Sequence, residues 1–281
     1  MFSNKIITRN YIIILVLIFG LSSKNKKNEK RVDELVESIP KHLQVDHFNI
    51  WVKNPNKAKE KLIDIGFNAV PDSLSQVHFG QGTAGKYFNF LNSYLELIFV
   101  YDQKELEENN LKNKDLDFTK RANFKKNGAS PFSIALKVKN YDVEKIPFEK
   151  VRYHQDWMEE NSNIFSAKNS KTHLKEPSIF VVYPEIESQV FESLSVLENI
   201  PSEDPFWKEF FKHTNGAKKV TNIIITSMDL DLETETIRAV NEIENITIKS
   251  GKEHLMELYF DSNIQSQSFD LRPDLPLIIN L

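Results

Sequence analysis

The segment Tyr94–Tyr101, with the sequence YLELIFVY, is the strongest strand signal in the chain, and it contains a carboxylate. Side chains alternate between the two faces of a strand, so Leu95 and Leu97 share one face, while Glu96 lies on the other. A carboxylate in so apolar a strand is costly if it is buried without a partner. The fold must therefore compensate Glu96 with a metal, a histidine, an arginine or water.

The segment 44–52, with the sequence QVDHFNIWV, alternates in the same way and is predicted to be a strand. One of its faces is apolar and the other mixes polar and aromatic side chains: Phe48, Ile50 and Val52 against His47, Asn49 and Trp51. A helix that packs on a sheet needs an apolar surface beneath it, so we expect Phe48, Ile50 and Val52 to face a helix. His47 then lies on the same surface as Glu96, provided that both strands belong to one sheet.

A helix is predicted directly after this strand. Asn54 is a favoured N-cap residue, Pro55 suits the first helical position, and Gly66 lies where a helix C-cap belongs. Further strands are predicted over 67–70 and 86–91, before the strand that contains Glu96. The first module therefore spans about 43–102 and has the order strand, helix and three strands.

The same order recurs weakly along the chain, which indicates an internal repeat. A second module, about 130–185, is predicted from strands at 131–138 and 177–183 with a short crossover at 141–148. A third, about 219–281, combines strands with a helix over 230–243. Its strands are predicted at 220–226, 246–249, 255–261 and 275–280. The third module matches the first better than the second does.

Composition excludes several classes of function. Lysine and arginine number 36 and aspartate and glutamate 40, for a formal net charge of -4, which argues against nucleic acid as the main partner. The chain has no cysteine, so disulfides, thiolate metal sites and cysteine nucleophiles are excluded. Hydrophobic residues make up 40% of the 281 residues, enough for a packed core.

The N-terminus is typical of a targeting segment. Lys5 and Arg9 precede the apolar run Tyr11–Leu21, and lysines follow it. As a helix this run would span only about 16 Å at 1.5 Å per residue, against a hydrocarbon core of ~30 Å. We therefore favour a secretory signal over 1–23, with an uncleaved membrane anchor as the alternative. Residues 24–42 are predicted to be a polar linker. Either case places the ordered part, 43–281, outside the cytoplasm, with the N-terminal segment as its one contact with a membrane.

The sequence also resembles a known family. The motif His78-Phe79-Gly80-Gln81-Gly82-Thr83, followed by Tyr94-Leu95-Glu96-Leu97, is similar to glyoxalase-like members of the vicinal oxygen chelate (glyoxalase/bleomycin resistance/dioxygenase) superfamily. The strand that contains His47 and the tail Phe269-Asp270-Leu271-Arg272-Pro273 add to this resemblance. It extends from about residue 45 to the C-terminus and is densest over 45–101.

The resemblance implies an α+β fold of repeated βαβββ modules, whose curved mixed sheets surround a cavity. It also implies that His47 and Glu96 bind a divalent metal such as zinc, manganese, nickel or iron. In such enzymes the metal binds two substrate oxygens and stabilises an anionic intermediate. Glu96 is then the catalytic residue, as metal ligand or base, and the substrate pocket is formed by Asn49, Trp51, His78 and Tyr94. Sites of this kind are often completed across module pairs, which leaves a homodimer open.

The sequence departs from this pattern in its later modules. An open catalytic metal site has about three protein ligands. Where further ligands are expected, the later modules have Ser133, Asn222 and Pro276. Other candidates are His173, Glu176 and Glu257, and none is in register. His154, Asp156 and Glu159 are explained equally well by a loop.

The turn from Gly80 to Thr83 has two interpretations. Its backbone N–H groups could bind a ligand, or its glycines could simply let the chain reverse between two strands. It lacks the Lys-Ser/Thr pair of a phosphate loop, which argues against nucleotide binding.

Two functions follow from the sequence. The first is an exported glyoxalase-like protein that binds a small organic molecule and performs metal-assisted lyase, isomerase or dioxygenase chemistry. The alternative is a non-catalytic binding or envelope structural protein that has lost the metal site. The missing ligands in the later modules favour the alternative.

Overall fold

The computed structural model describes residues 42–281. The predicted signal or anchor at 1–23 lies outside the described residues, as does nearly all of the predicted linker at 24–42. Among residues 42–281, no helix combines the length and the apolar character that a membrane crossing requires.

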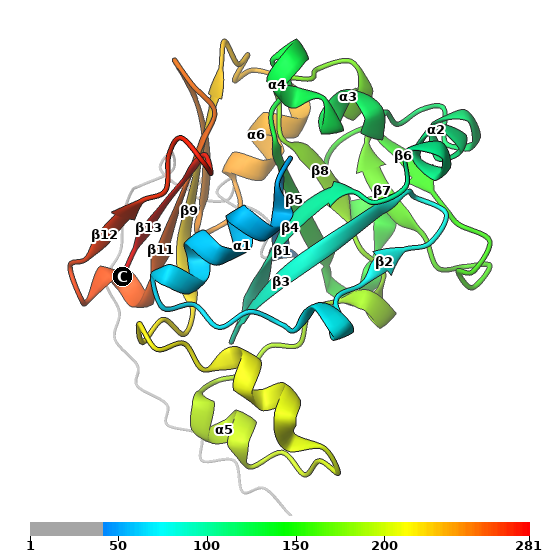
Figure 1. The fold of residues 1–281 in the computed structure, drawn as a ribbon. Coiled ribbons are helices and arrows are strands. Elements are labelled where there is room, and N and C mark those ends of the chain that lie inside the picture. The colour runs from blue at the N-terminus through cyan, green and yellow to red at the C-terminus, as the bar shows by residue number, and fades with distance from the viewer. Residues whose placement is uncertain (1–41) are drawn as a thin grey trace, which may run out of the picture. The chain divides into compact units, whose positions relative to one another are not determined.

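The larger of two sheets has eight strands in the order β2-β3-β4-β1-β5-β8-β7-β6 (Figure 1). Its strands are β1 (Leu43–Trp51), β2 (Val77–His78), β3 (Thr83–Phe90), β4 (Ser93–Val100), β5 (Phe132–Val138), β6 (Lys150–Tyr153), β7 (Ile164–Ala167) and β8 (Ser178–Val181). Strand β1 is parallel to β4 and β5 is parallel to β8, while β1 and β5 join the two halves antiparallel. The two halves therefore repeat one strand order, as a paired-module fold requires.

The described residues form six α-helices around the sheets: α1 (Pro55–Asp64), α2 (Gln103–Lys112), α3 (Phe118–Ala122), α4 (Phe124–Asn127), α5 (Leu194–Glu198) and α6 (Glu235–Asn241). The predicted start of α1 is confirmed, because Asn54 Oδ1 accepts a hydrogen bond from the Lys57 backbone N–H at 3.1 Å. Gly66 follows the helix with a φ of 89°, a conformation that favours glycine. The corresponding crossover of the second half contains only short 3₁₀ turns, Lys139–Tyr141 and Val143–Lys145.

The third set of strands forms a separate five-stranded sheet with the order β10-β9-β11-β13-β12. These strands are β9 (Val220–Met228), β10 (Ile246–Gly251), β11 (Leu255–Phe260), β12 (Ser268–Asp270) and β13 (Leu277–Asn280). Strand β9 lies between a parallel β10 and an antiparallel β11. The first and second sets share a strand order that the third lacks, although the sequence favoured the first and third. In the third set, α6 leads directly into β10, which pairs with β9 in parallel. In the first set, the strand that pairs with β1 in parallel is β4, three strands later in the chain.

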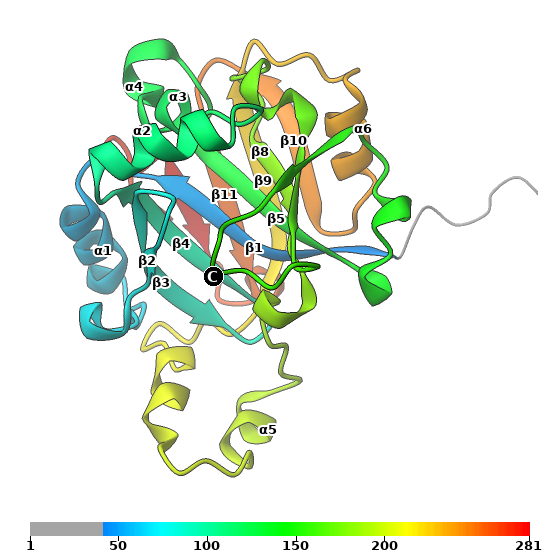
Figure 2. The ribbon, with the colours of Figure 1, turned by 90° about the vertical axis from the view of Figure 1, so that its right-hand side faces the viewer.

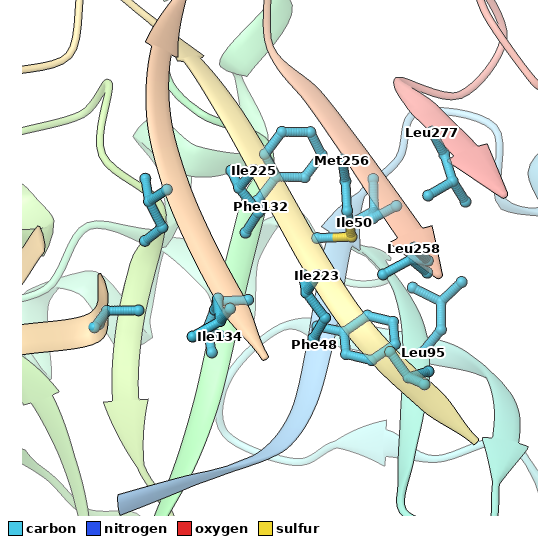
Figure 3. Packing of buried hydrophobic residues seen from close by; sticks show 14 of the residues in the cluster. Phe48, Ile50, Leu95, Phe132, Ile134, Ile223, Ile225, Met256, Leu258 and Leu277 are labelled. Atoms are coloured by element: carbon cyan, nitrogen blue, oxygen red, sulfur yellow. The ribbon is translucent and has the colours of Figure 1, made fainter. Parts of the chain in front are cut away.

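The hydrophobic core lies between the two sheets (Figure 3). The predicted apolar face of β1 is confirmed, since Phe48 and Ile50 are fully buried. They belong to one cluster with Leu62 of α1 and with Met256 and Leu258 of the second sheet. The expectation that a helix alone covers this face is therefore incomplete, because the second sheet packs against it as well. Burying each such side chain contributes roughly 1.5–3 kcal/mol.

Several predicted elements differ from the observed ones. Residues 67–70 are not a strand, although the Val70 N–H donates to the Tyr87 carbonyl. The predicted helix over 230–243 is confined to α6, and strands β2, β6, β7 and β12 were not predicted. These strands have two to four residues, too few for alternation to be recognised.

Candidate functional site

A cavity of about 980 Å³ lies on the face of the eight-stranded sheet opposite the core. All six residues predicted for the site lie in its wall: His47, Asn49, Trp51, His78, Tyr94 and Glu96. Strands β1 and β4 bring most of them together, because these strands are neighbours in the sheet (Figure 2). Their register places Asn49 directly opposite Glu96. The side chains that alternation assigned to one surface do share one.

Glu96 is the centre of a buried hydrogen-bond network. Asn49 Nδ2 donates to Glu96 Oε2 at 2.7 Å, and the Tyr87 hydroxyl donates to Glu96 Oε1 at 3.3 Å. His78 Nε2 lies 3.3 Å from the same Oε1. Burial raises the pKa of Glu96 to about 8, while the Tyr87 hydrogen bond opposes this rise. Glu96 is therefore a carboxyl group that holds a proton at neutral pH in the wall of the cavity.

His78 forms the second part of this network. Its Nδ1 is 2.7 Å from Thr83 Oγ1, and its Nε2 is 2.9 Å from the Tyr87 hydroxyl. Burial lowers the pKa of His78 to about 4, with a smaller contribution from the nearby His47. A neutral imidazole thus lies beside a protonated carboxyl group. Transfer of the Glu96 proton to His78 would create two buried charges, so burial keeps both groups neutral.

His47 belongs to a separate acid–imidazole pair. Its Nδ1 is 2.6 Å from Asp46 Oδ1, and its ring stacks on Tyr94 at a centroid distance of 4.2 Å. Asp46 Oδ2 accepts from the backbone N–H and the hydroxyl of Ser188 at 2.7 and 2.9 Å. Burial acts to raise the pKa of Asp46, but the bonds from His47 and Ser188 together hold it below its ordinary value. Asp46 thereby fixes the orientation of the imidazole ring.

Asp46 and Tyr87 were missed by the sequence analysis. Alternation places Asp46 on the face opposite His47, but the register of β1 against β5 shifts between Val45 and His47. Such a bulge lets two adjacent side chains approach each other, which regular alternation forbids. Tyr87 lies directly opposite Glu96 on β3, and its contact could have been found only after the pairing of β3 with β4 was known.

The side chains around Glu96 do not supply a complete set of ligands for the divalent metal that the resemblance implies. No group of three or more His, Asp or Glu side chains within 42–281 is placed to hold a metal ion. Glu96 accepts hydrogen bonds at both oxygens, while the Asp46 contact at His47 Nδ1 leaves Nε2 as the ring nitrogen that is free for a ligand. The residue of β5 opposite Asn49 is Ser133. These residues do not fit a centre with three protein ligands.

Two of the other candidate ligands lie in structural contacts. Asp156 pairs with Lys112 at 2.6 Å. Glu176 is buried and accepts a hydrogen bond from Asn169, whereas His173 is exposed. Arg272, in the C-terminal tail that carries part of the resemblance, pairs with Asp270 and with Glu253, each at 2.5 Å.

The turn at Gly80 helps to close the cavity. Gly80 and Gly82 both have positive φ, and the turn reverses the chain between β2 and β3. It is bonded to the segment that follows β6. Tyr153 Oη donates to Gln81 Oε1 at 3.0 Å, and Gln155 Nε2 donates to the Gly80 carbonyl at 3.1 Å. Trp157 Nε1 donates to the Phe79 carbonyl at 2.9 Å. These bonds join the two ends of the curved sheet.

Comparison with known proteins adds little to this geometry. No family model and no curated protein matches the sequence. The fold is α+β, with repeated modules whose curved mixed sheets are described above. Similar solved structures include a hypothetical protein from Staphylococcus aureus, at 14% identity and a TM-score of 0.48, covering 84% of this chain and 98% of that one.

Two further similar structures match about half of this chain. Methylmalonyl-CoA epimerase from Mycobacterium tuberculosis has 16% identity and a TM-score of 0.34, covering 54% of this chain and 95% of that one. Hypothetical protein BH1468 from Bacillus halodurans C-125 has 10% identity and a TM-score of 0.35, covering 53% and 99%. Superpositions this loose say nothing about substrate, so the chemistry has to be argued from the side chains.

Proposed function

We propose that the cavity binds a small organic molecule and that Glu96 transfers a proton to or from it. The observation that supports this most is the buried Glu96 carboxyl, hydrogen-bonded to Asn49 and Tyr87 and 3.3 Å from His78 Nε2. Strongly perturbed carboxyl groups in cavities are typical of acid–base catalysts. Isomerisation by proton transfer at a carbon beside a carbonyl group is the reaction that suits such a group.

The two acid–imidazole pairs have different roles in this proposal. Glu96 removes or delivers the proton, and His78 with Tyr87 adjusts its proton affinity. His47, whose Nδ1 donates to Asp46, presents its other ring nitrogen to the substrate as a hydrogen-bond acceptor or second base. Asn49 Oδ1 is buried without a hydrogen-bond partner among the described residues, and it can accept a hydrogen bond from the substrate.

A test follows exchange of carbon-bound hydrogen. The protein is incubated in D2O with 2-hydroxy ketones, 2-oxo acids and their amides, and deuterium uptake is followed by NMR. Exchange that is catalysed by the wild type and lost in Glu96→Gln supports the proposal. Exchange at the uncatalysed rate with every compound that binds contradicts it.

A second candidate is a non-catalytic binding protein, and it is supported over metal-assisted chemistry because residues 42–281 contain no group of three metal ligands. Saturable binding without exchange is its expected result. Elemental analysis of the purified wild type and of Glu96→Ala tests whether the protein binds a metal. Stoichiometric metal in the wild type that is lost in the variant would support metal-assisted chemistry.

We also propose that the chain is exported through residues 1–23. The basic start and the short apolar run Tyr11–Leu21 support this. Cell fractionation with mass measurement of the mature N-terminus tests it, and a full-length cytoplasmic product would contradict it.

A further inference from the structure

Arg121 of α3 lies in the cavity wall, away from the groups described above. Its side chain is 3% exposed. The two terminal nitrogens donate to backbone carbonyls: Nη1 to Leu174 and Glu176 at 2.8 and 2.5 Å, and Nη2 to Ser170 at 2.6 Å. Among the described residues that line the cavity, Arg121 is the single lysine or arginine. The carbonyls hold the guanidinium in a fixed position.

Two donors at this place have no partner. Arg121 Nε and Ser170 Oγ are both buried and make no hydrogen bond within the described part of the chain. Both residues line the cavity, and the Ser170 carbonyl is already bonded to Arg121. Buried polar groups are almost always hydrogen-bonded, so two unpartnered donors on residues that are bonded to each other indicate that something else binds there.

The charge of Arg121 also lacks a direct counter-ion. No carboxylate of residues 42–281 lies within 4.0 Å of the guanidinium, and the nearby acids are Glu176 and Asp117. Burial raises the pKa of Glu176, and Asp117 is engaged by the Lys120 backbone N–H at 2.9 Å. Burial lowers the pKa of Arg121 to about 10, so the guanidinium stays charged at neutral pH. The carbonyls and these two acids offset part of the cost of burying the charge, and an anionic ligand at Nε would offset more of it.

We propose that Arg121 Nε and Ser170 Oγ bind the carboxylate of a small organic acid, which makes organic anions the substrate class of this cavity. This rests on the proposed function in one respect, since it takes the cavity to be the substrate site. Two donors match the two oxygens of a carboxylate. A phosphate would present a third oxygen, and the described residues beside Arg121 offer no third unpartnered donor for it.

The experiment compares acids with their uncharged amides. Lactate, pyruvate and malonate are titrated against lactamide, pyruvamide and malonamide by calorimetry, in the Glu96→Gln background so that no turnover occurs. Ser170→Ala removes the hydroxyl but keeps the carbonyl that Arg121 needs. Ser166→Ala is the matched control, because Ser166 also lines the cavity but its hydroxyl donates to the Ile179 carbonyl at 3.4 Å. Arg121→Lys retains the charge and loses the Nε donor.

At least one acid is expected to bind more tightly than its amide. Ser170→Ala should weaken acid binding about tenfold, because it removes one hydrogen bond to a charged group. The affinity for the amides should not change. Equal affinity for acid and amide, an unchanged acid affinity in Ser170→Ala, or no binding of any acid overturns the proposal. Selective acid binding without deuterium exchange in the wild type would reject the proposed chemistry while leaving this subsite in place. Deuterium exchange in the wild type together with equal affinity for acids and amides would support the proposed chemistry and reject this subsite.

Discussion

Asn49 and Glu96 lie directly opposite each other on the parallel strands β1 and β4, with Asn49 Nδ2 2.7 Å from Glu96 Oε2. The amide uses its donor on the carboxyl group, and its own oxygen remains buried without a partner in the described residues. This arrangement orients Glu96 while offering an acceptor to a ligand. It also explains how a carboxyl group is tolerated in an otherwise apolar strand, because the neighbouring strand supplies a hydrogen bond.

The first prediction concerns the pH dependence of stability. The ordinary pKa of Glu96, 4.5, is raised to about 8 in the folded protein. Below pH 4.5 both states hold the proton. As the pH rises from there to about 8, the unfolded chain releases the proton while the folded chain keeps it, so the wild type loses stability. Relative to Glu96→Gln, the loss should be roughly 1.4 kcal/mol per pH unit, with no further change above that window.

Urea unfolding of both proteins across this pH range measures the difference. Glu60→Gln, a substitution of an exposed carboxylate on α1, reports the effect of removing a surface charge. A difference between wild type and Glu96→Gln that stays constant with pH would show that Glu96 ionises in its ordinary range.

The second prediction concerns the pH profile of proton exchange. A base must be ionised, so the exchange rate should rise with pH towards the Glu96 pKa of about 8. The Tyr87 hydrogen bond lowers this pKa, and Tyr87→Phe should therefore move the midpoint upward by up to about one pH unit. Tyr259→Phe, on the second sheet, is the control. A midpoint that moves downward, or not at all, contradicts the role given to Tyr87.

The third prediction concerns the pair of Asp46 and His47. Asp46→Asn leaves His47 Nδ1 without its carboxylate and should lower the exchange rate at least about tenfold, with a loss of about 1–3 kcal/mol in stability. The pKa of Asp46 is held below its ordinary value of 3.8. Its contribution is therefore present above that pH and is lost as the pH falls below it.

Ser188→Ala serves as the comparison for Asp46→Asn. It removes one donor to Asp46 but keeps the backbone N–H and the carboxylate charge. Thermal unfolding and exchange rates should change less than in Asp46→Asn. An equal loss in the two variants would mean that Asp46 acts through Ser188 rather than through His47.

The cavity face could be predicted because β1 and β4 are long, regular strands. Alternation over eight or nine residues assigns each side chain to a face without reference to the rest of the chain. That is why His47, Asn49 and Glu96 were expected on one surface, and they do line one cavity. The apolar face was found for the same reason.

The partners of these residues could not be predicted, because they depend on contacts between distant segments. The bulge between Val45 and His47 brings the Asp46 carboxylate to the His47 ring, and no local sequence pattern predicts this bulge. Arg121 comes from a short helix between the two halves of the sheet, and its contacts lie about fifty residues further along. The strands of the second sheet were predicted as a third module with the strand order of the first. Alternation identifies strands but not which strands are neighbours, so the different order of this sheet was not predicted.

The last prediction uses the space beside Glu96. A Cβ atom on Gly85 would lie 2.4 Å from Glu96 Oε1 and 2.4 Å from the Tyr87 hydroxyl. Gly85 has no positive φ, so alanine suits its backbone and the clash falls on the site itself. Gly85→Ala should therefore displace the carboxyl group and lower the exchange rate at least tenfold, while overpacking costs about 1–3 kcal/mol.

Exchange kinetics and urea unfolding of Gly85→Ala measure both effects, and circular dichroism checks that the sheets remain formed. The double variant with Glu96→Gln provides the decisive comparison. If Gly85→Ala acts by moving Glu96, it should cost little further activity once the carboxylate is gone, because substitutions in contact are not additive. Full additivity would show that the clash is absorbed elsewhere and that the position of Glu96 does not limit the reaction.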